Sequence, residues 1–312
     1  MKKLVSGIML TLLLTSMLAL VFNIQPVKGS GTIYIRADGS IDPPTAPIST
    51  SDNVTYILTG NITSAGNGIV VQKNNTMING NGFTLQCSSS GNGFTLSGTN
   101  NVTIENTNIE DFQGVSYKQN IGVYFNSSSN CSIIGNSMTN NTYGIYFNSS
   151  SNCAIIGNTI TNNQWGICLD FSSSNTLFGN NAVNNHYGVW LESSHHNTLS
   201  HNTITGDGYS EGIRLFLCDH NVLSDNTVTN QYAGIRLTSS SNNTLLCNNA
   251  ADDGYGIGIH EFSYNNTLSG NNAVNNTVIG IWLYISGSNL LSGNNVTDNY
   301  SGIDFSTSSG NL

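Results

Sequence analysis

Two acidic and two basic residues stand at equivalent places in the middle of the chain. Asp170 and Glu192 are 22 residues apart, and so are Arg214 and Arg236. If residues at this spacing lie side by side on neighbouring strands, about 5 Å separates the Cα atoms of the two acids, near the carboxylate separation of retaining glycosidases. Arginines bind carboxylates through paired hydrogen bonds, which suits a uronic-acid polymer. The four residues are candidate catalytic groups; alternatively, they only pair with one another across an exposed strand face.

Aromatic and imidazole side chains accompany these charges at the same period. Tyr and Trp rings stack on the faces of sugars, so this set predicts a groove that binds a glycan. The alternative is purely structural, because aromatic residues favour strands in any case. The candidate ligand-binding residues are Tyr124, Tyr146, Trp190, His260, Trp282 and Tyr284.

A third group contains the residue types that bind transition metals. The segments SSHHN and LCDHN stand where other repeats have SSSN, and their alignment pairs His196 with His220 and brings His195 and Cys218 close to them. Imidazoles and a thiolate bind copper or zinc, so these four residues are candidate metal ligands and copper is a candidate cofactor. The alternative is a set of solvated turn residues, since no second group that would orient the imidazoles is evident.

A repeat of about 22 residues explains these spacings. The segments GVYFNSSSNCSIIGNSMTNNTY, GIYFNSSSNCAIIGNTITNNQW and GICLDFSSSNTLFGNNAVNNHY align without gaps. Apolar and polar residues alternate at three places in each segment, which is typical of strands, and no helical period follows the first 30 residues. Such repeats bury their apolar positions only by stacking. We therefore predict an all-β parallel β-helix of about eleven coils with three short strands per coil. The coils begin at Gly68, Gly93, Gly122, Gly144, Gly166, Gly188, Gly212, Gly234, Gly256, Gly280 and Gly302.

One asparagine recurs in nearly every repeat, and we interpret it as structural. Stacked amides hydrogen-bond from coil to coil, and asparagine tolerates tight bends. The column consists of Asn136, Asn158, Asn180, Asn202, Asn226, Asn248 and Asn294.

The repeat resembles that of NosD-type β-helix proteins. The segments GIYFNSSSNCAIIGNTITNN and GIRLTSSSNNTLLCNNAADD carry the resemblance, which extends over roughly residues 60 to 312. It implies a right-handed parallel β-helix of the kind that carbohydrate-binding proteins and sugar hydrolases also use. It further implies a connection with copper, because the group includes the periplasmic maturation protein for the copper site of nitrous oxide reductase. The same coil serves lyases, hydrolases and adhesins, so the resemblance predicts the fold more sharply than the function.

The two ends of the chain differ from the repeats. Lys2, Lys3 and the apolar stretch that follows them predict an export signal or N-terminal anchor over residues 1–30. Residues 31–60 hold the remaining prolines and are expected to cap the first coil, and residues 61–312 form the β-helix. The last coil stops part-way without a cap, from which we expect a longer natural chain or self-association.

The composition limits the classes of partner that the protein can bind. Charged residues make up 8% of the chain, and 17 acidic against 8 basic residues give a net charge of −9. A phosphate backbone would be repelled, so nucleic acid is excluded as a partner, and contact with membrane is expected only through the N-terminal segment. The sequence thus favours an extracytoplasmic binding or structural module for a glycan or cell-surface polymer. The alternatives are a polysaccharide lyase or glycoside hydrolase, and a periplasmic copper-binding accessory protein.

Overall fold

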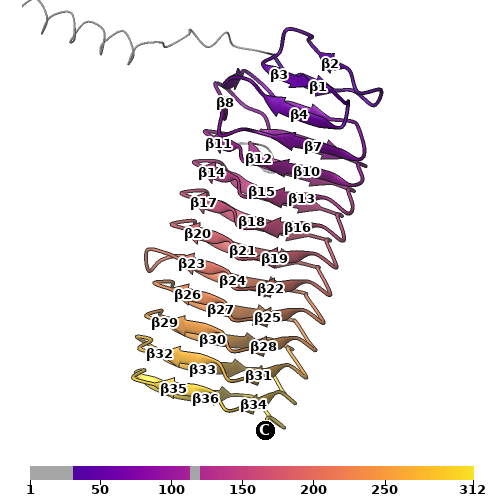
Figure 1. Ribbon diagram of the computed structural model, residues 1–312. Coiled ribbons are helices and arrows are strands. Elements are labelled where there is room, and N and C mark those ends of the chain that lie inside the picture. The colour runs from indigo at the N-terminus through magenta and orange to yellow at the C-terminus, as the bar shows by residue number, and fades with distance from the viewer. Residues whose placement is uncertain (1–30, 113–119) are drawn as a thin grey trace, which may run out of the picture.

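The chain forms a parallel β-solenoid of stacked coils (Figure 1). The computed structural model describes residues 31–112 and 120–312, so the predicted export segment lies outside the described residues. Within the described ranges the regular elements are strands, which form three sheets along the stack. The predicted all-β fold of about eleven coils with three strands each is therefore confirmed. In this part of the chain no helix is long and apolar enough to cross a membrane.

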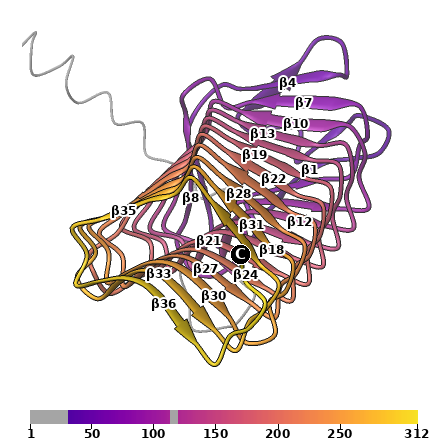
Figure 2. The ribbon, with the colours of Figure 1, turned by 90° about the horizontal axis from the view of Figure 1, so that it is seen from below.

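Each coil contributes one strand to each sheet, and the view along the stack shows the strands of each sheet in a row (Figure 2). Sheet 1 contains, in spatial order, β2 (Ile41–Asp42), β1 (Ile33–Ile35), β6 (Ile69–Val71), β9 (Phe94–Ser97), β12 (Ile121–Asn126), β15 (Tyr143–Asn148), β18 (Trp165–Asp170), β21 (Tyr187–Glu192), β24 (Glu211–Phe216), β27 (Ala233–Thr238), β30 (Tyr255–His260), β33 (Ile279–Tyr284) and β36 (Ser301–Ser306). Sheet 2 contains β3 (Ile48–Thr50), β4 (Thr55–Leu58), β7 (Thr76–Asn79), β10 (Val102–Glu105), β13 (Ser132–Ile134), β16 (Ala154–Ile156), β19 (Thr176–Phe178), β22 (Thr198–Ser200), β25 (Val222–Ser224), β28 (Thr244–Leu246), β31 (Thr267–Ser269) and β34 (Leu290–Ser292). Sheet 3 contains β5 (Ile62–Ser64), β8 (Thr84–Cys87), β11 (Asn108–Glu110), β14 (Ser137–Thr139), β17 (Thr159–Thr161), β20 (Asn181–Val183), β23 (Thr203–Thr205), β26 (Thr227–Thr229), β29 (Asn249–Ala251), β32 (Asn272–Val274) and β35 (Asn295–Thr297).

The register between coils follows the repeat of the sequence. In sheet 1, Leu191 of β21 lies beside Leu215 of β24, and Trp190 lies beside Arg214. Because successive residues of a strand point to opposite faces, the leucines point into the solenoid while Trp190 and Arg214 point outward. One apolar core runs through the stack, and sheets 2 and 3 contribute residues such as Leu199 to it. This register turns sequence positions one repeat apart into spatial neighbours.

Buried asparagines join the coils at the bends. In the predicted column, the amide of Asn180 donates to Oδ1 of Asn202 at 2.9 Å, and the side chain of Asn202 donates in turn to Asn226 at 2.9 Å. A second ladder includes Asn163 and Asp253, and a third includes Asn197 and its neighbours in adjacent coils. The side chains satisfy backbone groups that would otherwise be buried without partners, so the structural interpretation of the asparagines holds.

The first strands depart from the parallel pattern. β2 pairs antiparallel with β1, and β3 pairs antiparallel with β4. β1 and β4 then pair in parallel with β6 and β7 of the next coil. The division of the chain into a cap over residues 31–60 and a repeat domain over residues 61–312 stays a prediction.

Candidate functional site

The outward face of sheet 1, called here the sheet 1 face, carries all of the predicted catalytic and ligand-binding residues. Its long strands run side by side from β12 to β36. Tyr124 and Tyr146, Asp170 and Glu192, and Arg214 and Arg236 are register partners in adjacent strands. Each of these residues therefore lies beside the neighbour that the repeat spacing of the sequence predicts.

The N-terminal half of the sheet 1 face is more buried than a ligand surface requires. Tyr146 is only 2% exposed and Asp170 only 6%. The ring of Tyr146 packs against Tyr124 and Tyr143, with ring centroids 5.5 and 5.2 Å apart. Contact between Tyr146 and a ligand stays a prediction and would need this buried ring to become accessible.

The hydroxyl of Tyr146 donates a hydrogen bond to Oδ2 of Asp170 at 3.0 Å. Burial raises the pKa of Tyr146 well above its ordinary value, and the negative charge of Asp170 raises it further. The phenol therefore stays protonated. A protonated phenol cannot act as a base here. Asp170 and Glu192 lie side by side as predicted, but their use as a catalytic acid pair stays a prediction.

The two arginines share a carboxylate that the sequence analysis did not single out. Nη1 of Arg214 donates to both oxygens of Glu211 at 2.9 and 3.0 Å, and Nη1 of Arg236 lies 3.5 Å from Oε1. The guanidinium of Arg214 also lies over the ring of Trp190, 4.7 Å from its centroid. Glu211 holds the two arginines on the sheet 1 face in place of Asp170 or Glu192, which were the expected partners.

Glu211 could have been found from the repeat. In register it takes the place that Trp165 and Tyr187 hold in the preceding coils, so a carboxylate interrupts an aromatic column. Trp165 and Tyr187 stack with ring centroids 4.1 Å apart. Tyr209, two residues before Glu211, is 85% exposed and does not continue the aromatic column, because its coil contains two extra residues before the strand.

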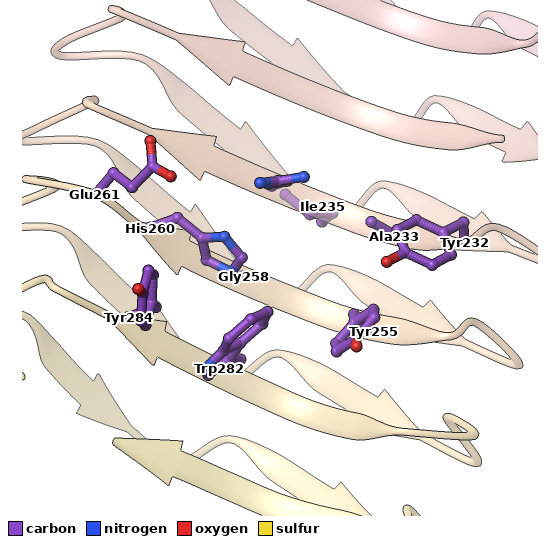
Figure 3. Close-up of a pocket in the computed structure, with 10 residues that line it drawn as sticks. Tyr232, Ala233, Ile235, Tyr255, Gly258, His260, Glu261, Trp282 and Tyr284 are labelled. Carbon is purple, nitrogen blue, oxygen red and sulfur yellow. The ribbon is translucent and has the colours of Figure 1, made fainter. Parts of the chain in front are cut away.

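The C-terminal half of the sheet 1 face contains a pocket of about 380 Å³ (Figure 3). Arg236 lies on one side of it and Trp282 on the other, and Gly258 forms part of its lining between them. Tyr255 stacks on Trp282 with ring centroids 5.3 Å apart. The pocket thus combines one guanidinium group with four aromatic rings, those of Tyr232, Tyr255, Trp282 and Tyr284.

His260 occupies the inner part of this pocket and is only 5% exposed. Its ring meets the ring of Trp282 edge to face, with centroids 4.4 Å apart. Burial, assisted by the positive charges of Arg236 and Arg214, lowers the pKa of His260 to about 4. The imidazole is therefore neutral near pH 7, and Arg236 supplies the positive charge in the pocket.

The predicted metal ligands lie in two adjacent coils as expected, but they do not converge on one point. His196 and His220 stack at the surface with centroids 5.1 Å apart, both in the left-handed backbone conformation that histidine tolerates in turns. Nδ1 of His195 accepts a hydrogen bond from the backbone of Asp219 at 3.0 Å. Cys218 is fully buried in the apolar core. The described residues contain no group of three or more metal-binding side chains, so this set does not fit a copper or zinc centre.

Comparison with known proteins agrees with the observed architecture. The model of the right-handed beta helix region matches residues 48–204 and 92–251, about two thirds of the chain. The chain belongs to the right-handed β-helix family. Residues 206–312 match the model of the periplasmic copper-binding protein NosD, which bears out the resemblance of the repeat. No curated protein is similar enough to the chain to be counted as a relative.

Several solved right-handed β-helix structures are similar in fold at low sequence identity. The A-module of the mannuronan C-5 epimerase AlgE4 from Azotobacter vinelandii matches with a TM-score of 0.69 and 15% identity, over 91% of each chain. The periplasmic alginate epimerase AlgG matches with a TM-score of 0.64 and 16% identity, over 91% of this chain and 82% of that one. The lacto-N-biosidase from Eubacterium ramulus matches with a TM-score of 0.50 and 12% identity, over 82% of this chain and 51% of that one. At these identities the likeness shows the fold alone.

Proposed function

We propose that the sheet 1 face binds a glycan chain, with the contacts concentrated between β21 and β33. The proposal rests on the spatial order of the groups along neighbouring strands, in which aromatic rings are followed by arginines and then by a pocket. Trp190 lies against Arg214, and Arg236 is followed by the pocket that Trp282 closes. Partly exposed Trp rings beside a concave surface are typical of sugar binding, because the ring faces stack on the apolar faces of pyranoses.

The structural neighbours are compatible with this proposal. The epimerases named above act on mannuronan or alginate, and the biosidase is named for a glycan as well. A parallel β-helix presents a long face of regularly spaced strands to a polymer, and the same fold serves several activities. A binding role asks only for the aromatic rings and polar groups of the face. It also suits an extracytoplasmic location, which the match to a periplasmic family supports.

Copper handling is not proposed for this chain. His195 already accepts a hydrogen bond, and Cys218 points into the core, so two of the four expected ligands are occupied or inaccessible. The sheet 1 face is the better-formed site, because it combines a pocket with exposed edges of aromatic rings.

Replacing Trp190 or Trp282 by alanine is expected to weaken glycan binding about two- to twelvefold, as the loss of one stacked ring costs about 0.5–1.5 kcal/mol. A glycan panel identifies the ligand, and titration calorimetry then measures the affinity of each variant. Phe178→Ala is the matched control, because Phe178 is a 45% exposed aromatic side chain on sheet 2. Equal losses in the control and the Trp variants, or no glycan bound by the parent protein, would contradict the proposal.

A further inference from the structure

The pocket includes one strand position that has no side chain. Along the central column of the sheet 1 face, Arg214, Arg236 and Trp282 occupy the positions on either side of Gly258. The resulting space of about 380 Å³ falls within the range of small-ligand sites. Figure 3 shows His260, Tyr255 and Trp282 around this position.

The backbone does not require glycine at position 258. Gly258 lies inside the regular strand β30, and its φ is not positive. A Cβ atom there would lie 2.7 Å from Nε2 of His260, so the buried imidazole occupies part of the space over the glycine. A glycine inside a strand costs roughly 0.5–1 kcal/mol relative to alanine. The glycine therefore makes room for the His260 imidazole and for the pocket beside it, at some expense to the strand.

The polar groups around the space are mainly donors. Nε of Arg236 and Nε1 of Trp282 are buried N–H groups for which the described residues provide no hydrogen-bond acceptor. Nε2 of His260 also has no partner there, and this imidazole is uncharged near neutral pH. A carboxylate, which only accepts hydrogen bonds and is negatively charged, complements such a set.

Nearby acids do not cancel this preference. Glu211 accepts hydrogen bonds from Nη1 of Arg214 and forms an ion pair with Nη1 of Arg236. The buried Nε–H of Arg236 is left for another acceptor. Glu261, at the edge of the pocket, is exposed to solvent, where its charge is screened. The chain carries a net charge of −9, but at physiological ionic strength only charges within about 8 Å act strongly on a ligand.

We propose that the pocket over Gly258 holds one uronic-acid residue of the bound glycan, with its carboxylate on Arg236 and its ring against Trp282 and Tyr255. This inference rests on the proposed glycan-binding function and specifies the class of sugar. The donors of Arg236 and Trp282 distinguish the acid from a neutral sugar, and the aromatic rings contribute to both.

The test compares hexasaccharides of galacturonate, mannuronate and guluronate with the same oligosaccharides after their carboxyl groups have been reduced to alcohols. Calorimetry on the full chain is expected to show at least one acidic form binding about tenfold or more tightly than its reduced form. Arg236→Gln should bring this ratio close to one. Lys73→Gln, which removes one charge elsewhere on the molecule, should leave the ratio unchanged.

Two further variants separate binding from folding. Gly258→Val pushes against the His260 imidazole and fills the space beside it, and should abolish the binding of the acidic form. The melting temperature of this variant is measured as well, so that a loss of binding in a folded protein is distinguished from unfolding, while Arg236→Gln tests the subsite without adding atoms. Trp282→Phe keeps the ring but loses the N–H donor, and should reduce the acid preference more than the affinity for the reduced form. Equal binding of acidic and reduced forms, or binding of neutral glycans only, overturns the uronate subsite and leaves the glycan-binding function standing. Absence of binding to every glycan in a broad panel overturns both.

Discussion

Replacing Asp253 by asparagine is expected to stabilise the protein by about 1–3 kcal/mol near pH 8 and to remove part of its pH dependence. Asp253 is 1% exposed and takes the place of an asparagine in the second ladder. Its Oδ1 accepts the backbone N–H of Gln231 at 2.8 Å, as an asparagine would. Its Oδ2 has no partner among the described residues, in the place where the other members carry an NH₂ donor.

The surroundings of a true ladder asparagine explain why the acid is unfavourable there. Nδ2 of Asn163 donates to the backbone oxygens of Met138 and Thr161 and to the side-chain oxygen of the next asparagine. A carboxylate in such a place directs a negative oxygen at other oxygens. Burial, with a smaller contribution from Asp252, accordingly raises the pKa of Asp253 from 3.8 to about 8.

The sign of the pH dependence follows from these two pKa values. Between about pH 4 and pH 8 the folded chain keeps a proton on Asp253 that the unfolded chain releases, so the stability contributed by this residue falls as the pH rises. His260 acts in the opposite direction, because its folded pKa is lowered from 6.5 to about 4 and its stability is lost as the pH falls through that interval. The effect of Asp253 should therefore be clearest above pH 6.5.

Thermal unfolding at a fixed scan rate, from pH 6.5 to 9, measures the difference between the parent protein and Asp253→Asn. The melting temperature of the parent should fall towards pH 8, while that of the variant should stay higher and flatter. Asp252→Asn is the matched control, since Asp252 is the exposed neighbour and asparagine tolerates its left-handed backbone. Parallel curves for the parent and Asp253→Asn would show that the buried acid does not control the pH dependence.

The period of the sequence was sufficient to predict the fold and the register. Once the repeats are aligned on their first glycines, here Gly188 and Gly212, the pairing of Trp190 with Arg214 follows, and the structure has that pairing. The strands, the inward leucines and the asparagine column follow in the same way, because each coil buries its apolar residues only against the next. Local alternation and global stacking agree throughout the repeats.

The site was harder to predict because a repeat gives neighbours but not side-chain directions. It could not show that the hydroxyl of Tyr146 turns to Asp170, or that Glu211 reaches both arginines. The repeat also directs attention to the side chains that are present, whereas part of the pocket lining is Gly258, which has none. Departures from a column, such as Gly258 and Asp253, are the positions that sequence analysis of a solenoid should examine first.

Removing the side chain of Asn202 is expected to cost about 3 kcal/mol or more, one of the largest effects of a single substitution in this chain. Asn202 is 2% exposed. Its Oδ1 accepts the backbone N–H of Asn180 at 3.0 Å, and its Nδ2 donates to the carbonyl of Leu177 at 3.0 Å. Asn202→Ala leaves both backbone groups buried without these partners, and each unsatisfied group costs about 1–3 kcal/mol.

Heat or protease resistance measured at one pH tests this expectation, with Asn181→Ala as the control because Asn181 is exposed on β20. A melting temperature as high as that of the control would mean that neighbouring coils relax to fill the gap.

Asn202→Asp provides the converse of Asp253→Asn. It keeps the acceptor for Asn180 but replaces the donor, so its stability should approach that of the parent only at acidic pH, where the carboxyl group holds a proton. Opposite pH trends in these two substitutions would show that the ladder requires a donor at this atom in every coil, which is why the repeat uses asparagine.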